Sequence, residues 1–252
     1  AGCIVVNQGT DSTHIIFEDD LLCAMHKPAG VPFHSNDDEV GIVQQTKALL
    51  GSDSLFPVHR LDKMTSGLIL FAKNSQTNSD LSLLFSEKRI EKYYLALSLS
   101  KPKKKQGSII GDMKKGRRGS YLLTKQKEKP SITRFFAKKV SLIGGEANSV
   151  RAGWLFVMKP ETGRTHQLRV AAKSLGSAIY GDARYGSHPA DRGYLHAYMI
   201  RFKLGETVYE ICDPNFLGDY FKTKPLDDGG GAEPYMHPEK LNWSKSAFKL
   251  SA

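Results

Sequence analysis

The segment from residue 68 to 72, Leu-Ile-Leu-Phe-Ala, is the feature that most restricts how this 252-residue chain can fold. Five uninterrupted apolar residues are too few for a buried helix and show no alternation with polar residues. Such a run predicts a strand that is covered on both faces. The chain must therefore contain a sheet, and other elements must lie over this strand.

Short strand-like and helix-like segments recur along the rest of the chain at irregular intervals. Segments rich in β-branched and aromatic residues predict strands at residues 15–17, 21–25, 93–99, 132–137 and 154–158, with two or three more between 195 and 211. Helices are expected after a cap at Asp37 or Asp38, after a cap at Ser75, and after a loop that begins at Gly163. Because no regular βαβ rhythm links these segments, they predict an α+β fold in one continuous domain.

The composition changes near residue 221. Residues 222–252 are rich in glycine, proline and charged side chains, which predicts a tail with little core of its own. The globular domain is therefore expected to span residues 1–221.

Positive charge is concentrated in one segment of that domain. Residues 101–139 contain 14 Lys and Arg but only two acidic residues, so they account for all of the net charge of +10. Glycines interrupt the segment, which favours a hairpin or a long loop. Such a basic patch suits a polyanionic partner, because bound phosphates release their counterions. The alternative is a solvated loop without a partner.

Three polar motifs stand in order along the chain. The first, directly before the apolar run, is His59-Arg60-Leu61-Asp62-Lys63-Met64-Thr65-Ser66-Gly67. The second is Glu91-Lys92-Tyr93-Tyr94, and the third is Gly163-Arg164-Thr165-His166-Gln167-Leu168-Arg169. Lys27-Pro28-Ala29-Gly30, Ile179-Tyr180-Gly181-Asp182, Tyr185-Gly186 and Leu195-His196-Ala197 are further landmarks.

Taken together, these motifs resemble those of the RluA-type pseudouridine synthases. The first and third match that family's signatures without departure, and the resemblance runs from about Ile15 to Phe221. It implies a single catalytic domain built on a mixed, largely antiparallel sheet flanked by helices and loops. Ala171, Ala178 and Ile200 depart from common family residues, which bears on packing and substrate choice. No S4-type RNA-binding domain is expected before the core, so the core and the basic insert at 101–139 are expected to find the RNA.

The resemblance also implies roles for individual residues. Asp62 would be the catalytic carboxylate, attacking the sugar or the base or abstracting a sugar proton. Arg169 would keep Asp62 ionised and oriented. Tyr94 would stack on the uracil and serve the late removal of a proton. Its neighbour Tyr93 would face the other way on a strand, so only one of the two tyrosines can be the site residue.

Substrate contacts are expected from two groups of residues. Uracil inside a stem is out of reach, so the nucleotide must be flipped out, and Arg60 would hold the flipped state. Ile200, with Ile179 as the weaker candidate, would give the pocket an apolar wall. In the basic insert, the phosphate-gripping residues would be Lys114, Lys115, Arg117 and Arg118. His59, His166 and His196 are expected to be structural hydrogen-bonding residues.

Isomerising uridine neither oxidises nor hydrolyses anything, so neither a cofactor nor a metal is expected. The eight histidines show no metal-ligand spacing. Three widely spaced cysteines suit a reducing cytoplasm. The expected partner is RNA, either large-subunit ribosomal RNA or transfer RNA, with no membrane contact and a monomeric enzyme.

Two other functions fit parts of the sequence. A non-catalytic RNA-binding protein with this fold would not need Asp62, Tyr94 and Arg169 together. A metal-dependent nuclease would suit the basic charge, but the sequence offers no carboxylate cluster for Mg²⁺. Both are therefore weaker hypotheses than a pseudouridine synthase.

Overall fold

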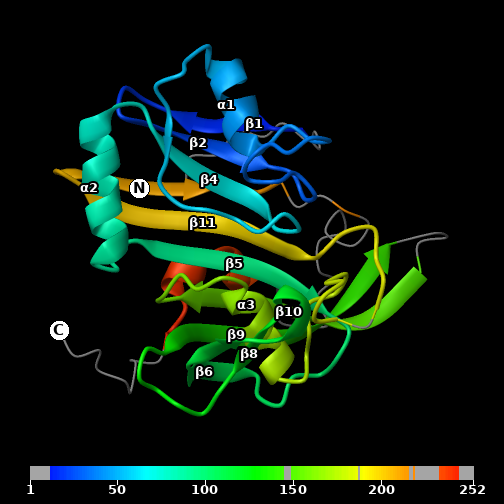
Figure 1. Ribbon diagram of the computed structural model, residues 1–252. Helices are drawn as coiled ribbons and strands as arrows, with labels where there is room; N and C mark the ends of the chain where they lie inside the picture. Colours follow the sequence, from blue (N-terminus) through cyan, green and yellow to red (C-terminus); the bar gives the residue numbers. More distant parts are fainter. Residues whose placement is uncertain (1–11, 145–148, 187, 216–217, 219–232, 244–252) are drawn as a thin grey trace. The chain divides into compact units, whose positions relative to one another are not determined.

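A computed structural model describes residues 12–144, 149–186, 188–215, 218 and 233–243. The chain divides into two compact units, which comprise residues 1–95 with 190–222 and residues 96–189 with 223–252 (Figure 1). The proposed division into a domain at 1–221 and a tail at 222–252 stays a prediction. Among the described residues, no helix is long and apolar enough to cross a membrane.

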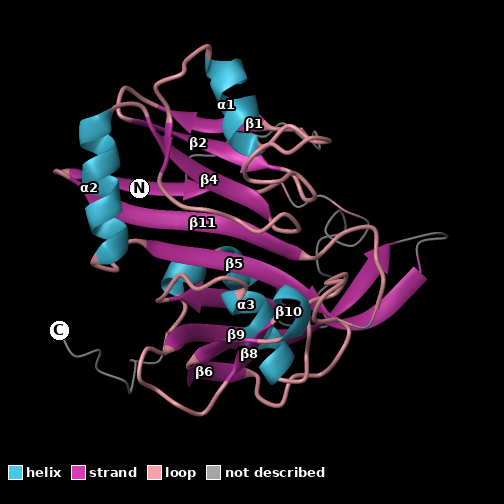
Figure 2. Cartoon of the chain, viewed as in Figure 1, coloured by secondary structure: helices cyan, strands magenta, loops and turns pink. Residues whose placement is uncertain are grey.

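The first unit contains a mixed sheet (Figure 2). Its strands are β1 (His14–Glu18), β2 (Leu22–Lys27), β3 (Phe56–Pro57), β4 (Ser66–Ala72), β5 (Glu91–Ser98), β11 (Leu195–Leu204) and β12 (Thr207–Cys212), and β5 runs on into the second unit. The order is β1-β2-β4-β11-β5, with β12 on β11 and β3 on β4. Strands β11 and β4 are parallel, whereas β1–β2, β2–β4, β3–β4 and β11–β12 are antiparallel. The expected mixed, largely antiparallel sheet is confirmed.

The apolar run at 68–72 forms the buried centre of β4, as predicted. Leu68 and Leu70 pack in a core with Leu22 of β2 and with Leu81 and Leu84 of the helix α2 (Ser75–Ser86). Helix α2 lies against this part of the sheet in Figure 1. Successive residues of a strand point to opposite faces of the sheet, so an uninterrupted apolar run is expected where both faces are covered. All residues of β4 are buried, which explains the run.

Both helix caps of the first unit differ from expectation. The side chain of Asn74, not Ser75, accepts the amide of Thr77 and caps α2. Helix α1 (Ile42–Leu50) begins after Gly41, and neither Asp37 nor Asp38 caps it. Asn36 takes up the local amides instead, because its Oδ1 accepts those of residues 38 and 39 in a tight turn.

The second unit is built around antiparallel strands in the order β10-β9-β6. These strands are β6 (Gln106–Gly111), β9 (Ser131–Gly144) and β10 (Ser149–Pro160). Helix α3 (Gln167–Ser174) packs on β9 and β10. It follows the loop predicted from Gly163.

The basic insert at 101–139 has the hairpin form, not that of a long loop. Strand β6 pairs with the first part of β9, and the chain between them makes a second antiparallel pair. That pair, residues 113–123, consists of β7 (Met113–Lys115), the turn η1 (Arg117–Gly119) and β8 (Tyr121–Leu123), and we call it the basic ribbon. A substantial part of the insert therefore belongs to the strands of the second unit.

The described part of the C-terminal segment packs on the second unit. It forms the short turns η3 (Glu233–Met236) and η4 (Pro238–Lys240). The ring of Trp243 lies 4.9 Å from that of Phe136 in β9, edge to face. Its indole nitrogen donates to the carbonyl of Pro238 at 2.7 Å. An aromatic anchor thus fixes residues that composition alone suggested had little core.

Candidate active site

Asp62 lies in the loop that leads from β3 into β4. The carbonyl of Asp62 accepts the amide of Thr65 at 3.0 Å, which closes a turn just before the strand. Leu61 is buried and Asp62 itself is half-buried. The loop therefore holds a carboxylate at the end of a rigid strand without removing it from solvent.

Lys27, at the end of β2, ties this loop to the sheet. Its side chain is fully buried, and its ammonium donates to the carbonyls of Pro28 at 2.9 Å, Val31 at 2.7 Å and Lys63 at 3.2 Å. The carbonyl of Lys63 also accepts the amide of Gly30 at 2.8 Å. Because Lys63 follows Asp62 directly, these bonds fix the backbone beside the carboxylate.

The pKa of Lys27 depends on its burial and on the charges around it. Burial is the main cause that lowers the pKa of Lys27 to about 7, and the positive charge of Arg192 lowers it further. The carboxylate of Asp62 acts in the opposite direction and raises this pKa. Asp62 therefore lies close enough to Lys27 for the two charges to interact.

We expect Lys27→Met to lower the free energy of unfolding at pH 7 by about 1–3 kcal/mol, because buried carbonyls lose their donor. Lys27 titrates at about 7 in the folded protein and near 10.5 when unfolded, so the unfolded state binds more protons between these values. Lys27 therefore makes wild-type stability rise with pH in this window, and the variant should lack that gain. Denaturant unfolding at pH 6 to 9 measures both effects: an unchanged free energy of unfolding at pH 7 would contradict the first, and identical pH slopes would contradict the second.

Tyr94 is the tyrosine that shares the surroundings of Asp62. It lies on β5 and is 9% exposed. Burial raises the pKa of its phenol far above the usual value, and the negative charge of Asp62 raises it further. The phenol is therefore protonated at neutral pH and lies within the electrostatic reach of the carboxylate. This favours Tyr94 over Tyr93 for the site.

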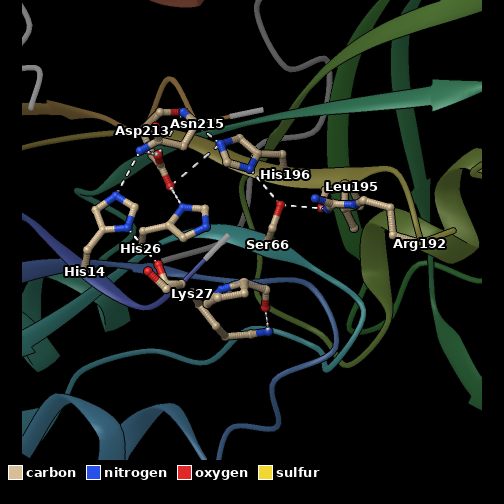
Figure 3. Close-up of polar contacts among 11 residues, drawn as sticks. His14, His26, Lys27, Ser66, Arg192, Leu195, His196, Asp213 and Asn215 are labelled. Carbon is tan, nitrogen blue, oxygen red and sulfur yellow. Dashed lines mark hydrogen bonds and ion pairs between the residues drawn. The ribbon is translucent and has the colours of Figure 1, made fainter. Parts of the chain in front are cut away.

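A buried polar network supports the start of β4 (Figure 3). Ser66 accepts a hydrogen bond from Arg192 at 2.7 Å and bonds to Nδ1 of His196, also at 2.7 Å. His196 Nε2 donates to the carbonyl of Asp213 at 2.8 Å, and the Asp213 carboxylate lies 2.6 Å from His26 Nδ1. Burial lowers the pKa of His196 to about 4, so the neutral ring makes both bonds.

The histidines expected to be structural are all hydrogen-bonded. His196 belongs to the network above, and Nε2 of His59 accepts the amide of Leu70 at 3.0 Å. His166 Nδ1 lies 2.9 Å from the hydroxyl of Tyr185. Each of the three therefore has a role in holding the backbone or a side chain in place.

Arg60 and Ile200, both expected to contact substrate, occupy different surroundings. Arg60 is exposed, and its guanidinium carbon lies 5.0 Å from the centre of the Phe33 ring. Ile200 is 2% exposed within the hydrophobic core of the first unit. That position accounts for its apolar side chain without a substrate, and its place in a pocket wall stays a prediction.

Arg169 lies on α3 in the second unit and pairs with Asp182. Its Nε donates to one carboxylate oxygen at 2.8 Å and a terminal nitrogen donates to the other at 2.9 Å. Both side chains are nearly buried. The expected contact of Arg169 with Asp62 joins residues of different units and stays a prediction.

The remaining substrate residues also lie in the second unit. Ile179 is 1% exposed. The four residues expected to grip phosphates are exposed on β7 and η1 of the basic ribbon: Lys114, Lys115, Arg117 and Arg118. Their exposure suits contact with RNA, which stays a prediction.

Sequence reasoning missed the residues that support the site. Lys27 appeared only as part of a loop motif, and Arg192, Asp213 and Asp182 had no assigned contacts. One signal was available, because Lys27 ends a strand whose residues are otherwise apolar apart from His26. A lysine in that place needs several acceptors. The acceptors themselves come from distant segments and could not be read from the sequence.

Among the described residues, no group of three or more His, Cys, Asp or Glu side chains is arranged to hold a metal ion. The buried carboxylate of Asp213, in the same unit as Asp62, is paired with His26. The site found here contains a half-buried carboxylate whose charge acts on a buried phenol and a buried lysine. It suits acid–base or nucleophilic chemistry by side chains.

Residues 22–174 match the family model described as RNA pseudouridylate synthase. An "Uncharacterized RNA pseudouridine synthase" of Haemophilus influenzae is 45% identical over 80% of this chain and 87% of its own length. The "Ribosomal large subunit pseudouridine synthase C" of Vibrio vulnificus is 35% identical over 75% of this chain, and the match spans 60% of that protein. The solved structure "Human RNA Pseudouridylate Synthase Domain Containing 1" superposes with a TM-score of 0.72 at 22% identity, covering 95% of this chain and all of that one. This last likeness shows the fold.

Proposed function

Because this chain belongs to the RNA pseudouridylate synthase family, we propose that it converts uridines of large-subunit ribosomal RNA to pseudouridine, with Asp62 as the catalytic carboxylate. The observation that carries the proposal is the position of Asp62. Its loop is fixed by Lys27 and Thr65, and its charge acts on both Lys27 and Tyr94. A carboxylate on a fixed backbone suits attack on the sugar or the base, or abstraction of a sugar proton.

The reaction breaks the bond from N1 to C1′ of uridine, turns the uracil and forms a bond from C5 to C1′. The proton on C5 leaves, and N1 gains one, so the product has the atoms of the substrate. Asp62 would act at the glycosidic bond, and the site would have to close around the base to keep the detached uracil from escaping. Arg60 would hold the flipped nucleotide outside the stem.

Tyr94 would act in the last step as a proton relay. Its raised pKa makes a free phenolate unfavourable, so the phenol would take the C5 proton only while it gives its own proton to water, and N1 would take up a proton from water in the same overall reaction. Its ring also offers a face on which uracil can stack. This combination supports one role for the phenol in both binding and proton transfer.

Arg169 would keep the Asp62 carboxylate ionised. A guanidinium carries five N–H donors, and the contacts with Asp182 use two of them. One arginine can therefore serve two carboxylates. The planar fork of the guanidinium also fixes direction, which a lysine in the same place would not.

The choice of ribosomal RNA rests on the names of relatives such as the Vibrio vulnificus enzyme. A cytoplasmic location and a monomeric state, expected from the sequence, belong to the same proposal. The test is to map pseudouridines in total RNA from cells with and without the gene by carbodiimide labelling and primer extension. Loss of a site in large-subunit ribosomal RNA, restored by purified enzyme in the presence of EDTA, is the expected result. Loss in transfer RNA alone would reassign the substrate, and RNA cleavage that EDTA abolishes would indicate a nuclease.

The basic ribbon is expected to grip RNA before the base reaches Asp62. Replacing Lys114, Lys115, Arg117 and Arg118 with Ser should weaken RNA binding and flatten its salt dependence by about one log–log unit per lost phosphate contact. Single-turnover rates at saturating RNA should stay within about threefold of wild type. Binding titrations at several salt concentrations measure the slope, and an unchanged slope would contradict the role in gripping.

A further inference from the structure

The turn over residues 179–186 contains Ile179 and Asp182, which were discussed above, but its remaining residues have no role in the function proposed so far, although the sequence of the turn stood out among the motifs. The amide of Asp182 donates to the carbonyl of Ile179 at 3.1 Å, and that of Gly186 donates to the carbonyl of Asp182 at 2.8 Å. A Cβ atom at position 186 would lie 2.7 Å from that same carbonyl oxygen, so only glycine fits. The turn is therefore closely packed.

The carboxylate of Asp182 organises this turn from within. It is 1% exposed, and it accepts the amides of Arg184 at 2.9 Å and Tyr185 at 3.1 Å as well as the guanidinium of Arg169. Burial, the largest single influence, would raise the pKa of Asp182, but the hydrogen bond and charge of Arg169 together with the amides of Arg184 and Tyr185 outweigh it, so the pKa lies below its usual value. Arg169 is thus held by a charged partner that the turn itself keeps in place.

The ring of Tyr185 lies against the same guanidinium. The centre of its ring lies 5.0 Å from the guanidinium carbon of Arg169. Such a contact favours a cation over the ring face. Together the Asp182 carboxylate and the Tyr185 ring restrict where Arg169 can point.

The hydroxyl of Tyr185 also holds the basic ribbon. It accepts the amide of Tyr121, in β8, at 2.8 Å. Because the oxygen already accepts from that amide, its own proton is available to Nδ1 of His166, 2.9 Å away at the start of α3. The neighbouring Arg184 donates to the carbonyl of Arg118 in the turn of the ribbon.

These docking contacts go to the backbone of the ribbon, not to its charged side chains. The side chains of Lys114, Lys115, Arg117 and Arg118 are exposed and can meet phosphates without disturbing the docking. One short turn therefore holds both the element expected to grip RNA and the arginine expected to serve Asp62.

We propose that Tyr185 is a positioning residue, which fixes the guanidinium of Arg169 relative to the RNA-gripping ribbon. It acts through Arg169 and so rests on the function proposed above. A gripped RNA would thereby meet the catalytic arginine in one fixed register. Loosening this link should slow the chemical step more than it weakens RNA binding.

Tyr185→Phe tests the proposal, because it removes the hydroxyl but keeps the ring over Arg169. We expect the single-turnover rate at saturating RNA to fall about 10- to 100-fold, since small misplacements of a catalytic group are costly. RNA affinity should stay within about threefold, and thermal melting should confirm the fold. Tyr209→Phe is the matched control, because it removes a tyrosine hydrogen bond to Asp19 in the first unit, and its rate should stay within about twofold.

A double-mutant cycle with Arg169→Lys separates positioning from a merely structural role. Arg169→Lys should be slow, and adding Tyr185→Phe should slow it little further, because the group being positioned is gone. If the two losses multiply, or if Tyr185→Phe alone is as fast as Tyr209→Phe, the inference fails while the role of Arg169 stands. A fully active Arg169→Lys enzyme would overturn the role of Arg169 and this inference with it.

Discussion

Asp62→Asn is expected to abolish pseudouridine formation while the protein still folds and binds RNA. The Asp and Asn side chains are nearly the same size, so the hydrogen bonds that the backbone carbonyls of Asp62 and Lys63 accept from Thr65 and Lys27 should change little. The carboxylate chemistry, however, is lost, and a catalytic acid–base or nucleophilic group contributes at least about 100-fold. Release of tritium from RNA labelled at C5 of uridine measures turnover directly, because that proton must leave.

The matched control for this variant is Asp53→Asn, which changes an exposed acid of the same unit. Asp53→Asn should have wild-type turnover. Its melting temperature should equal that of Asp62→Asn, so that the two variants differ in turnover but not in stability. An Asp62→Asn enzyme with more than about a tenth of wild-type turnover would refute the assignment of Asp62. Loss of RNA binding together with turnover would instead point to a damaged loop.

Tyr94→Phe is expected to bind RNA with near wild-type affinity but to stall before the C5 proton leaves. The ring still offers a stacking face, whereas the relay through the hydroxyl is gone, which should cost at least about 100-fold in single-turnover rate. Deuterium at C5 should then slow the variant further, because removal of that proton has become the limiting step. Measuring the isotope effect in wild type and variant checks this point.

Tyr93→Phe is the control for that experiment, because it removes a phenol hydroxyl from the adjacent position on the same strand. It should turn over at close to the wild-type rate. Normal turnover by Tyr94→Phe would move the proton transfer to Tyr93 or to water. A slow variant without an isotope effect would mean that Tyr94 acts before the proton step.

Local sequence pattern predicted much of the fold. The apolar run of β4, the strand pattern of β9 and the loop before α3 follow from short-range periodicity, and all are found where expected. The caps were wrong, since Asn74 and Gly41 compete locally with Ser75 and the aspartates for the helix start. Such competition is decided by backbone geometry, which the sequence does not show.

The candidate site was likewise predicted in part from the sequence. The motifs identified Asp62, Tyr94 and Arg169 as site residues, because the chemistry of the reaction restricts which residue types can occupy these positions. The motifs did not predict that Asp182, 13 positions along the chain, pairs with Arg169. They also did not predict the three carbonyls that Lys27 binds. Those contacts depend on tertiary packing, as does the placement of Ile200 in the core and not at an evident surface.

The parallel pairing of β4 with β11 has a consequence for how the enzyme matures. Ser66 and His196 are 130 residues apart in the chain, yet their hydrogen bond helps to fix the strand that follows Asp62. Non-local pairings of this kind form late, because the loop between them must close first. On the ribosome, Asp62 emerges long before β11 and Asp213. The nascent chain therefore contains the catalytic carboxylate well before the strand and side chains that fix its position have been made. Activity should therefore appear only once synthesis has passed residue 213.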